Sequence, residues 1–298
     1  MVRALSILAA LEHEDASPAF SGGTSLSKGW GLIKRFSEDI DFKVAMEAGA
    51  SGAQERKRRS AYRKQVLEAL SASEFDLIAV KKGNESRFFT ADLAYHSHFE
   101  TRQALRPYIR IEMSFLPPTL QPIGRPIQSL IAQFENKSPE ILTFPCIDPV
   151  ETAADKLSAL AWRVCTRVRD AEGDDPTIIR HLHDLAALES HVACVPAFAA
   201  LVRQASEADT GRGGKEVPTK ARERFALMMK RLSQDELWAT EYESFVLNVS
   251  FAKEAERIPF AEAFAATKRL ADSVFGITSP KPRKFRNPGN FGVVNSSR

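Results

Sequence analysis

The sequence is poor in cysteine, and its cysteines are not arranged in pairs. Cys146, Cys165 and Cys194 are scattered along the chain, and no CxxC motif is present. This pattern excludes a disulfide framework, which needs an even set of cysteines. It predicts reduced thiols in a cytoplasmic protein.

Long apolar runs are also missing. No segment stays apolar over the ~18 residues that a membrane helix requires. The apolar run that follows Arg3 is short and ends in the charged residues 12–15, which is not typical of a secretory signal. We therefore expect a cytoplasmic localisation and no membrane partner.

Several common active-site motifs are absent as well. The chain has no GxxxxGK(S/T) loop, no GxGxxG loop and no convincing Ser-His-Asp order. His181 and His183 cannot hold one zinc ion together, because residues two apart on a helix diverge by ~200°. The sequence thus gives no indication of a P-loop, a dinucleotide-binding turn or a zinc site.

The overall composition is that of a folded, soluble protein. The 298 residues are 44% hydrophobic and 27% charged, and this length suits one large domain or two of ordinary size. The formal charge of +3 is only mildly basic. It allows a nucleic-acid partner without requiring one.

The pattern of the chain changes near residue 145. Before it, predicted helices at 3–12, 24–34 and 54–72 alternate with a strand that begins at Asp39 and strands at 75–81, 87–94 and 107–115. Prolines punctuate residues 116–147, which suggests an extended connector. Beyond it, helices are predicted at 148–168, 176–190, 196–208, 220–232, 234–247 and 259–275.

This division predicts an α+β fold in two domains. The N-terminal domain, residues 1–145, would hold a mixed β-sheet flanked by helices. An all-helical domain, residues 146–277, would follow, and a basic tail would occupy residues 278–298.

One stretch of the first half has the pattern of a phosphate and metal site. Gly22 and Gly23 allow close backbone approach to a phosphate, and the helix start that follows favours an anion. Asp39 and Asp41 are two apart on a predicted strand, so their side chains share the face opposite Ile40. Neighbouring carboxylates repel each other, and a divalent cation relieves that repulsion.

Two further charged features each have two interpretations. Glu112 lies on the polar face of the strand at 107–115. It is either a third carboxylate of the site or an exposed position of the sheet. The helix at 54–72 carries a run of arginine and lysine. That run is either a solvated face or a patch that contacts RNA or a partner.

The helix at 148–168 presents stacked cations. Lys156 and Arg163 are close to two helical turns apart, and such a pair suits a triphosphate, because lysine supplies a point charge and arginine a fork. The alternative is a surface stripe whose partners are Glu151 and Asp155.

Together these motifs resemble those of the AbiEii-like nucleotidyltransferases. This family provides the toxin half of type IV toxin–antitoxin systems and phage-defence modules, and belongs to the polymerase-beta-like nucleotidyltransferase superfamily. The resemblance covers residues 18–190. It rests on the glycine turn at 22–26, the segment Arg35-Phe36-Ser37-Glu38-Asp39-Ile40-Asp41, Lys156 with Arg163, and Asp184 in the segment that begins at Arg180.

The resemblance implies a role for each matched residue. The expected ligands of Mg²⁺ or Mn²⁺ are Asp39, Asp41 and Glu112. The expected catalytic residues are Asp39, Asp41, Lys156 and Asp184. The expected contacts to NTP are Gly22, Gly23, Thr24, Ser25, Lys156 and Arg163.

The activity implied is the transfer of an NMP from an NTP to an acceptor, by metal-assisted in-line attack. The expected acceptor is tRNA or another RNA 3′ end, and a cognate antitoxin is the expected protein partner. Two alternatives are a kinase-like phosphotransferase on the same scaffold and a non-catalytic module that binds NTP or antitoxin. The nucleotidyltransferase hypothesis requires Lys156 to lie near Asp41, in a cleft between the two halves.

Overall fold

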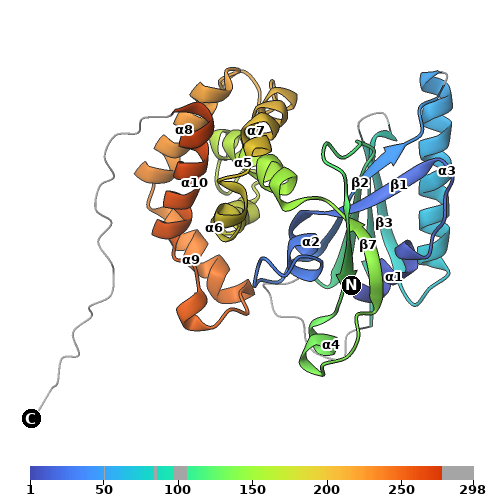
Figure 1. Ribbon diagram of the computed structural model, residues 1–298. Helices are drawn as coiled ribbons and strands as arrows, with labels where there is room; N and C mark the ends of the chain where they lie inside the picture. The colour runs from blue at the N-terminus through green and yellow to red at the C-terminus, as the bar shows by residue number, and fades with distance from the viewer. Residues whose placement is uncertain (50, 84–85, 97–105, 277–298) are drawn as a thin grey trace, which may run out of the picture.

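The computed structural model describes residues 1–276, apart from residues 50, 84–85 and 97–105. The basic tail predicted at 278–298 lies outside the described residues. The chain forms a β-sheet half and a helical half that lie side by side (Figure 1). None of the helices in the described ranges is long and apolar enough to cross a membrane.

The described strands of the first half form one mixed sheet. They are β1 (Ala16–Ser21), β2 (Asp39–Met46), β3 (Asp76–Gly83), β4 (Phe88–Ala94), β5 (Tyr108–Ser114), β6 (Ile123–Ile127) and β7 (Ile141–Cys146). Their order across the sheet is β3-β4-β5-β2-β1-β7-β6. Strand β2 is central, antiparallel to β1 and parallel to β5.

Helices cover the sheet and form the second half. Those of the first half are α1 (Val2–Ala9), α2 (Gly22–Lys28), α3 (Gly52–Ser71) and α4 (Leu130–Phe134). Those of the second are α5 (Pro149–Thr166), α6 (Arg180–Val192), α7 (Pro196–Ala208), α8 (Ala221–Gln234), α9 (Leu237–Val249) and α10 (Phe260–Phe275), with short 3-10 helices η2 (Pro176–Ile179) and η3 (Glu254–Glu256). The α+β prediction is confirmed.

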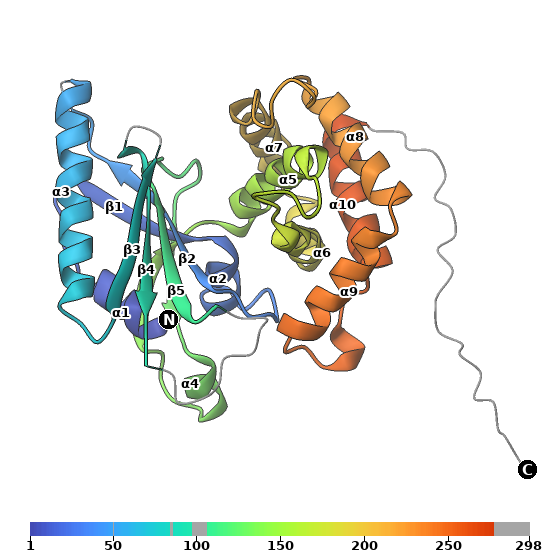
Figure 2. The ribbon, with the colours of Figure 1, turned by 180° about the vertical axis from the view of Figure 1, so that it is seen from behind.

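The two faces of the sheet have different neighbours. Helices α1 and α3 lie on one face, and α2 lies on the other, between the sheet and the helical half (Figures 1 and 2). The basic helix α3 is therefore on the side of the sheet away from the helical half. Arg59 and Arg63 of this helix are buried, so only part of its basic run is a solvated face.

Residue alternation along β2 is confirmed. Ile40, Phe42 and Val44 are buried in the core beneath α1 and α3. Asp39 and Asp41 occupy the intervening positions and so point toward the side of α2. One strand therefore supplies both the core of the first half and a polar surface that faces the second half.

The prediction of an extended connector over residues 116–147 is wrong. This segment contains β6, α4 and β7, and β7 extends the sheet by pairing in parallel with β1. Its prolines are tolerated because β6 is an edge strand and the pairing of β7 with β1 is confined to Phe20 opposite Cys146.

Two helices of the first half end earlier than predicted. The helix expected at 24–34 is the shorter α2, which ends at Lys28. Gly29 follows it, and Gly31 adopts a positive φ of 67° that helical residues do not use. The helix expected at 3–12 ends at Ala9. The helices of the second half lie where periodicity predicts them, and the domain boundary at residue 145 stays a prediction.

Apolar and polar contacts both join the two halves. Leu26 and Ile33 belong to the core of the helical half, although they precede β2 in the sequence. Trp30 packs against the cores of both halves, and its Nε1 donates to the carbonyl of Ile147 at 3.1 Å. The end of α2 and the segment that follows it therefore join the sheet to the helical half.

Glu151, in the first turn of α5, is the polar centre of this junction. Its carboxylate is buried and accepts hydrogen bonds from the backbone N–H groups of Thr119 and Leu120 at 2.8–3.1 Å. Lys43 of β2 donates to the same carboxylate at 2.7 Å and also to Asp155 at 2.6 Å. One side chain thus connects the central strand, the segment after β5 and the first helix of the second half.

We predict that Glu151→Ala lowers the free energy of unfolding by about 3 kcal/mol, because two N–H groups lose their acceptor and Lys43 loses one of two partners. Equilibrium urea unfolding measures this loss. The control, Glu151→Gln, keeps an acceptor oxygen and should lose less. An alanine variant as stable as the parent would contradict this view of the junction.

Candidate active site

A cleft of about 230 Å³ opens between the sheet and the helical half. Its walls come from both halves. The first half contributes Gly22, Gly23, Ser37, Asp39 and Asp41, and the second contributes Lys156, Arg163, Arg180 and His181. Lys156 and Asp41 therefore line the same cleft, as the nucleotidyltransferase hypothesis requires.

Neighbouring side chains leave no room for a larger residue at Gly22 or Gly23. Gly22 has a positive φ of 71°, and a Cβ built on it would come within 1.9 Å of Asp41 Oδ2. A Cβ on Gly23 would come within 2.7 Å of Arg35 Nη2 and 3.1 Å of Ser37 Oγ. The glycine pair thus lets the turn lie directly against the aspartate and the arginine.

Asp39 is held between two arginines. Arg106 donates to its Oδ1 at 2.5 Å, and Arg180 of α6 donates to its Oδ2 at 3.3 Å. Arg106 also binds Glu38, through its backbone N–H and its guanidinium. Asp39 is thus oriented by one arginine from each half of the protein.

Asp41 has no such partner. No described residue donates a hydrogen bond to its carboxylate or forms an ion pair with it. Burial, together with the negative charges of Asp39 and Glu112, raises the pKa of Asp41 to about 7. Lys156 and Arg180 oppose this rise without cancelling it. Among the described residues, Asp41 is therefore a carboxylate without a cationic side chain as a partner.

Glu112 lies beside Asp41 on the neighbouring strand but does not line the cleft. The two residues are in register between β2 and β5, and burial raises the pKa of Glu112, with a further contribution from Asp39. In the described ranges, no three side chains of histidine, cysteine, aspartate or glutamate are grouped to hold a metal. The role of Glu112 as a ligand stays a prediction.

The residues present nevertheless fit a magnesium ion. Mg²⁺ is commonly held by one or two protein carboxylates together with substrate phosphates and water. Asp39 and Asp41 supply two carboxylates on one face of β2. Burial and then the neighbouring negative charges raise the pKa of Asp41, and a divalent cation would relieve that repulsion.

The opposite wall of the cleft is built on one buried carboxylate. Asp184 of α6 is fully buried and accepts both arms of the Arg35 guanidinium, at 2.7 and 2.6 Å. Lys156 donates to the same carboxylate at 2.8 Å, and His183 lies 3.4 Å from it. Asp184 does not line the cleft, so it positions Arg35 and Lys156, which do.

The charges of this cluster compensate one another. Burial alone would raise the pKa of Asp184, but Arg35 and Lys156 hold it well below its ordinary value. Burial lowers the pKa of Lys156, and Asp184 opposes that change. Asp184 uses one of the three N–H donors of the Lys156 ammonium group, which leaves donors for a ligand in the cleft.

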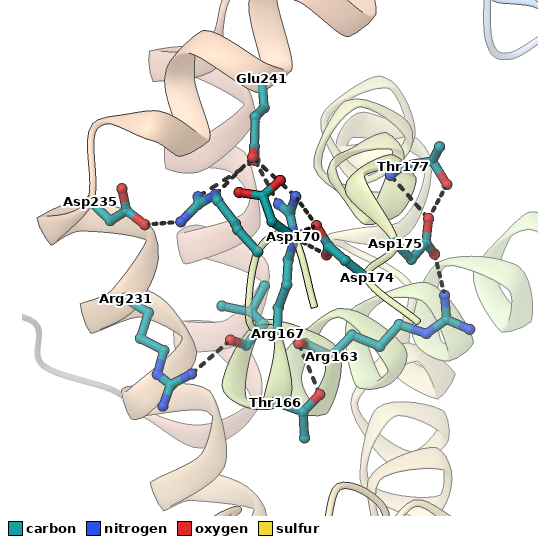
Figure 3. A network of polar contacts seen from close by, with 12 residues as sticks. Arg163, Thr166, Arg167, Asp170, Asp174, Asp175, Thr177, Arg231, Asp235 and Glu241 are labelled. Atoms are coloured by element: carbon teal, nitrogen blue, oxygen red, sulfur yellow. Dashed lines mark hydrogen bonds and ion pairs between the residues drawn. The ribbon is translucent and has the colours of Figure 1, made fainter. Parts of the chain in front are cut away.

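Arg163, near the end of α5, and Arg167, directly after it, differ in position. Arg163 lines the cleft and also forms an ion pair with Asp175 at 3.2 Å. Arg167 follows the helix and turns away from the cleft, toward Asp174 and Glu241, at 2.8 and 2.6 Å (Figure 3). The predicted stripe thus contributes Lys156 and Arg163 to the cleft, and Arg167 secures the loop after α5.

Thr24 and Ser25 lie behind the cleft. Both are buried, and neither lines it. The hydroxyl of Thr24 donates to the backbone carbonyl of Asp39, which ties α2 to the start of β2. Their expected contact with NTP stays a prediction, and the structure gives Thr24 alone a supporting hydrogen bond of this kind.

Three arginines near the cleft have no role that the sequence patterns predict, and two of them, Arg35 and Arg180, line it. Arg35 begins the segment 35–41, and Arg180 begins the segment that contains Asp184. Their partners are 149 positions away (Arg35 with Asp184) and 141 positions away (Arg180 with Asp39), so no local spacing predicts these pairs. Arg106 follows an undescribed segment and reaches Asp39 across 67 positions. Arg35 and Arg180 stand at the edge of a motif, which is the one local signal for them, and Arg106 has no such signal.

Comparisons with known proteins identify the family of the chain and a protein of similar fold. A sequence model of the family described as "Nucleotidyl transferase AbiEii toxin, Type IV TA system" matches residues 3–266. The chain is similar in structure to MenT4, a nucleotidyltransferase toxin from Mycobacterium tuberculosis H37Rv, with a TM-score of 0.52 and 17% identity, over 91% of this chain and 80% of that chain. At this identity the likeness shows the fold alone. No curated protein matches the chain.

We predict that Asp184→Asn lowers the free energy of unfolding by about 3–5 kcal/mol at pH 7, because Arg35 and Lys156 remain buried without their anion. Denaturant unfolding at several pH values measures this. The pKa of Asp184 is lowered in the folded state, so its contribution is present above the unfolded pKa and is lost as the pH falls below about 4. The deficit of the variant should therefore shrink in acid.

The matched control is Asp41→Asn, which removes a carboxylate from the same cleft. Asp41 has no cationic partner, and its pKa is raised, so the metal-free variant should be at least as stable as the parent at pH 8. Equal losses in the two variants would contradict the distinction between a positioning aspartate and an uncompensated one.

Proposed function

Because the chain belongs to the AbiEii family of nucleotidyl transferase toxins of type IV toxin–antitoxin systems, we propose that this cleft transfers an NMP from an NTP to an RNA acceptor. One observation carries the proposal. Asp41, an uncompensated carboxylate beside Asp39, faces Lys156 and Arg163 across a single cleft. A carboxylate pair opposite cations suits a metal-bound triphosphate.

Each wall would have its own task. Asp39 and Asp41 would hold Mg²⁺ or Mn²⁺, which when bound neutralises charge on the α-phosphate and favours deprotonation of the attacking hydroxyl. Lys156 and Arg163 would bind the β- and γ-phosphates. Gly22 and Gly23 would let those phosphates lie close to the backbone. The role of Asp184 would be to keep Lys156 charged and in place.

The reaction then requires little covalent chemistry from the protein. The acceptor hydroxyl oxygen forms a bond to the α-phosphorus, and the bond from that phosphorus to the α–β bridging oxygen breaks. The hydroxyl proton passes to solvent, and pyrophosphate leaves with the bridging oxygen. The protein contributes mainly the positions of the reactants and the neutralisation of charge.

The acceptor and the protein partner are the less constrained parts of the proposal. A tRNA or another RNA 3′ end would supply the hydroxyl. Exposed cations of α3 would contact RNA only at a distance from the cleft, since α3 lies on the face of the sheet away from the helical half (Figure 2). The family implies a cognate antitoxin. A role in phage defence follows from the same resemblance.

Two alternatives make different predictions about the label that is transferred. A kinase-like enzyme would transfer the γ-phosphate instead of the NMP. A non-catalytic module would bind NTP and transfer nothing, and the carboxylate pair would then have no task.

We predict that the purified protein attaches α-labelled nucleotide, but not γ-label, to an acceptor in total cellular RNA. Asp41→Asn should reduce this attachment by at least about a hundredfold, because loss of a metal ligand removes several kcal/mol of transition-state stabilisation. Removal of divalent cations with EDTA should abolish it, and added Mg²⁺ should restore it. Scintillation counting of the gel-separated RNA measures the transfer.

The matched control is Asp76→Asn, since Asp76 is an exposed aspartate of β3 and does not line the cleft. It should transfer label as the parent does. Transfer of γ-label alone would support the kinase-like alternative, and no transfer with any of the four NTPs to total RNA would refute the proposal.

A further inference from the structure

A second cavity adjoins the cleft. It measures about 450 Å³ and lies between the segment before β2 and helices η2 and α9. Arg35, Ser37 and Arg180 line both cavities, so the two meet at these residues. The second cavity is thus an extension of the cleft on the side of Asp39, to which Arg180 is bound.

The cleft needs such an extension if it binds a nucleotide. Its volume of about 230 Å³ is smaller than the ~300–1,000 Å³ typical of sites for drug-sized ligands. Its walls are glycine, aspartate, lysine and arginine, which suit phosphate and metal. The apolar part of a nucleoside triphosphate must therefore lie in a neighbouring space.

The second cavity has the walls that a nucleobase requires. Phe36, which is 44% exposed, and Phe245 of α9 both line it. Base stacking on aromatic rings is a common and sequence-tolerant mode of recognition. Asn248 also lines the cavity. Its Nδ2 donates to the carbonyl of Ser244, and its Oδ1 receives no hydrogen bond from any residue that the structure describes.

Both aromatic walls have contacts that hold them in place, and one of these contacts is with a residue of the active site. The N–H of Phe36 donates to the carbonyl of Val249 at 2.9 Å, and its ring meets the ring of Phe251 edge-on at 5.4 Å. The guanidinium of Arg35 lies 5.8 Å from the centre of the Phe245 ring. Arg35 therefore connects the aromatic cavity to the Asp184 cluster.

Another cavity, of about 460 Å³, meets the cleft at Arg163 and is a poorer candidate. Arg167, one of its polar residues, is already paired with Asp174 (Figure 3). Its one aromatic residue, Trp162, has the guanidiniums of Arg163 and Arg212 at 5.3 and 6.0 Å from its ring centre. It therefore offers one aromatic ring, whereas the cavity beside α9 offers two, Phe36 and Phe245.

We propose that the cavity lined by Phe36, Phe245 and Asn248 is the subsite for the nucleobase of the incoming NTP. The inference rests on the proposed function, since it places the base relative to a triphosphate in the cleft. It assigns the choice among NTPs to residues of α9 and of the segment before β2. The acceptor then binds elsewhere.

The test compares the binding of a nucleotide with the binding of inorganic triphosphate, which has no base. Isothermal titration with the four α,β-methylene NTP analogues and with inorganic triphosphate, in the presence of Mg²⁺, gives the dissociation constants. Phe36→Ala should raise the Kd for the preferred analogue about tenfold, the size expected from the loss of one stacking contact. It should leave the Kd for inorganic triphosphate unchanged.

Two further variants make the result specific. Phe36→Trp keeps an aromatic surface and should restore the affinity for the analogue. Phe134→Ala removes a ring that is 89% exposed on α4, outside both cavities, and should change neither constant.

Two results would overturn the inference while the proposed function stands. In the first, Phe36→Ala binds every analogue as the parent does. In the second, its only effect is a raised KM for the RNA acceptor, which would assign the cavity to the acceptor. If the parent binds neither the analogues nor inorganic triphosphate, the proposed function itself fails, and the inference with it.

Discussion

The buried carboxylate of Asp184 is the contact on which the arrangement of the cleft depends. It receives two hydrogen bonds from Arg35, which precedes the central strand, and one from Lys156, which lies in the first helix of the second half. A buried anion that lost these partners would be very unfavourable, so the three side chains hold one another in place. They also bring the cations of the helical half to the carboxylates of the sheet.

The other wall of the cleft shows the opposite electrostatic state. Asp41 lies against the Gly22 turn, beside Asp39 and Glu112, and burial with like charges raises its pKa to about 7. Folding alone gives no reason to keep a carboxylate there. Local destabilisation of this kind is characteristic of functional sites, where a bound ligand compensates the charge of the protein. Asp184, which has two cationic partners, therefore has a structural role, whereas Asp41, which has none among the described residues, is suited to bind a cation.

Local patterns predicted much of the fold and part of the cleft. Alternation placed Asp39 and Asp41 on one face of β2, and periodicity located the helices of the second half, because both signals depend on near neighbours. The strands β6 and β7 were missed, since prolines argue against strands unless the pairing partners are known. The pairing of Arg35 with Asp184 spans 149 positions, and only the tertiary fold reveals it.

The central claim is that one cleft, built from both halves, holds a metal-bound triphosphate. A crystal structure with Mg²⁺ and the preferred α,β-methylene NTP analogue tests it most directly. The account predicts a cation in contact with Asp39 and Asp41, phosphates beside Gly23 and Lys156, and an unchanged pair of Arg35 with Asp184. Phosphates bound away from Lys156, or a cation that does not touch Asp41, would contradict it.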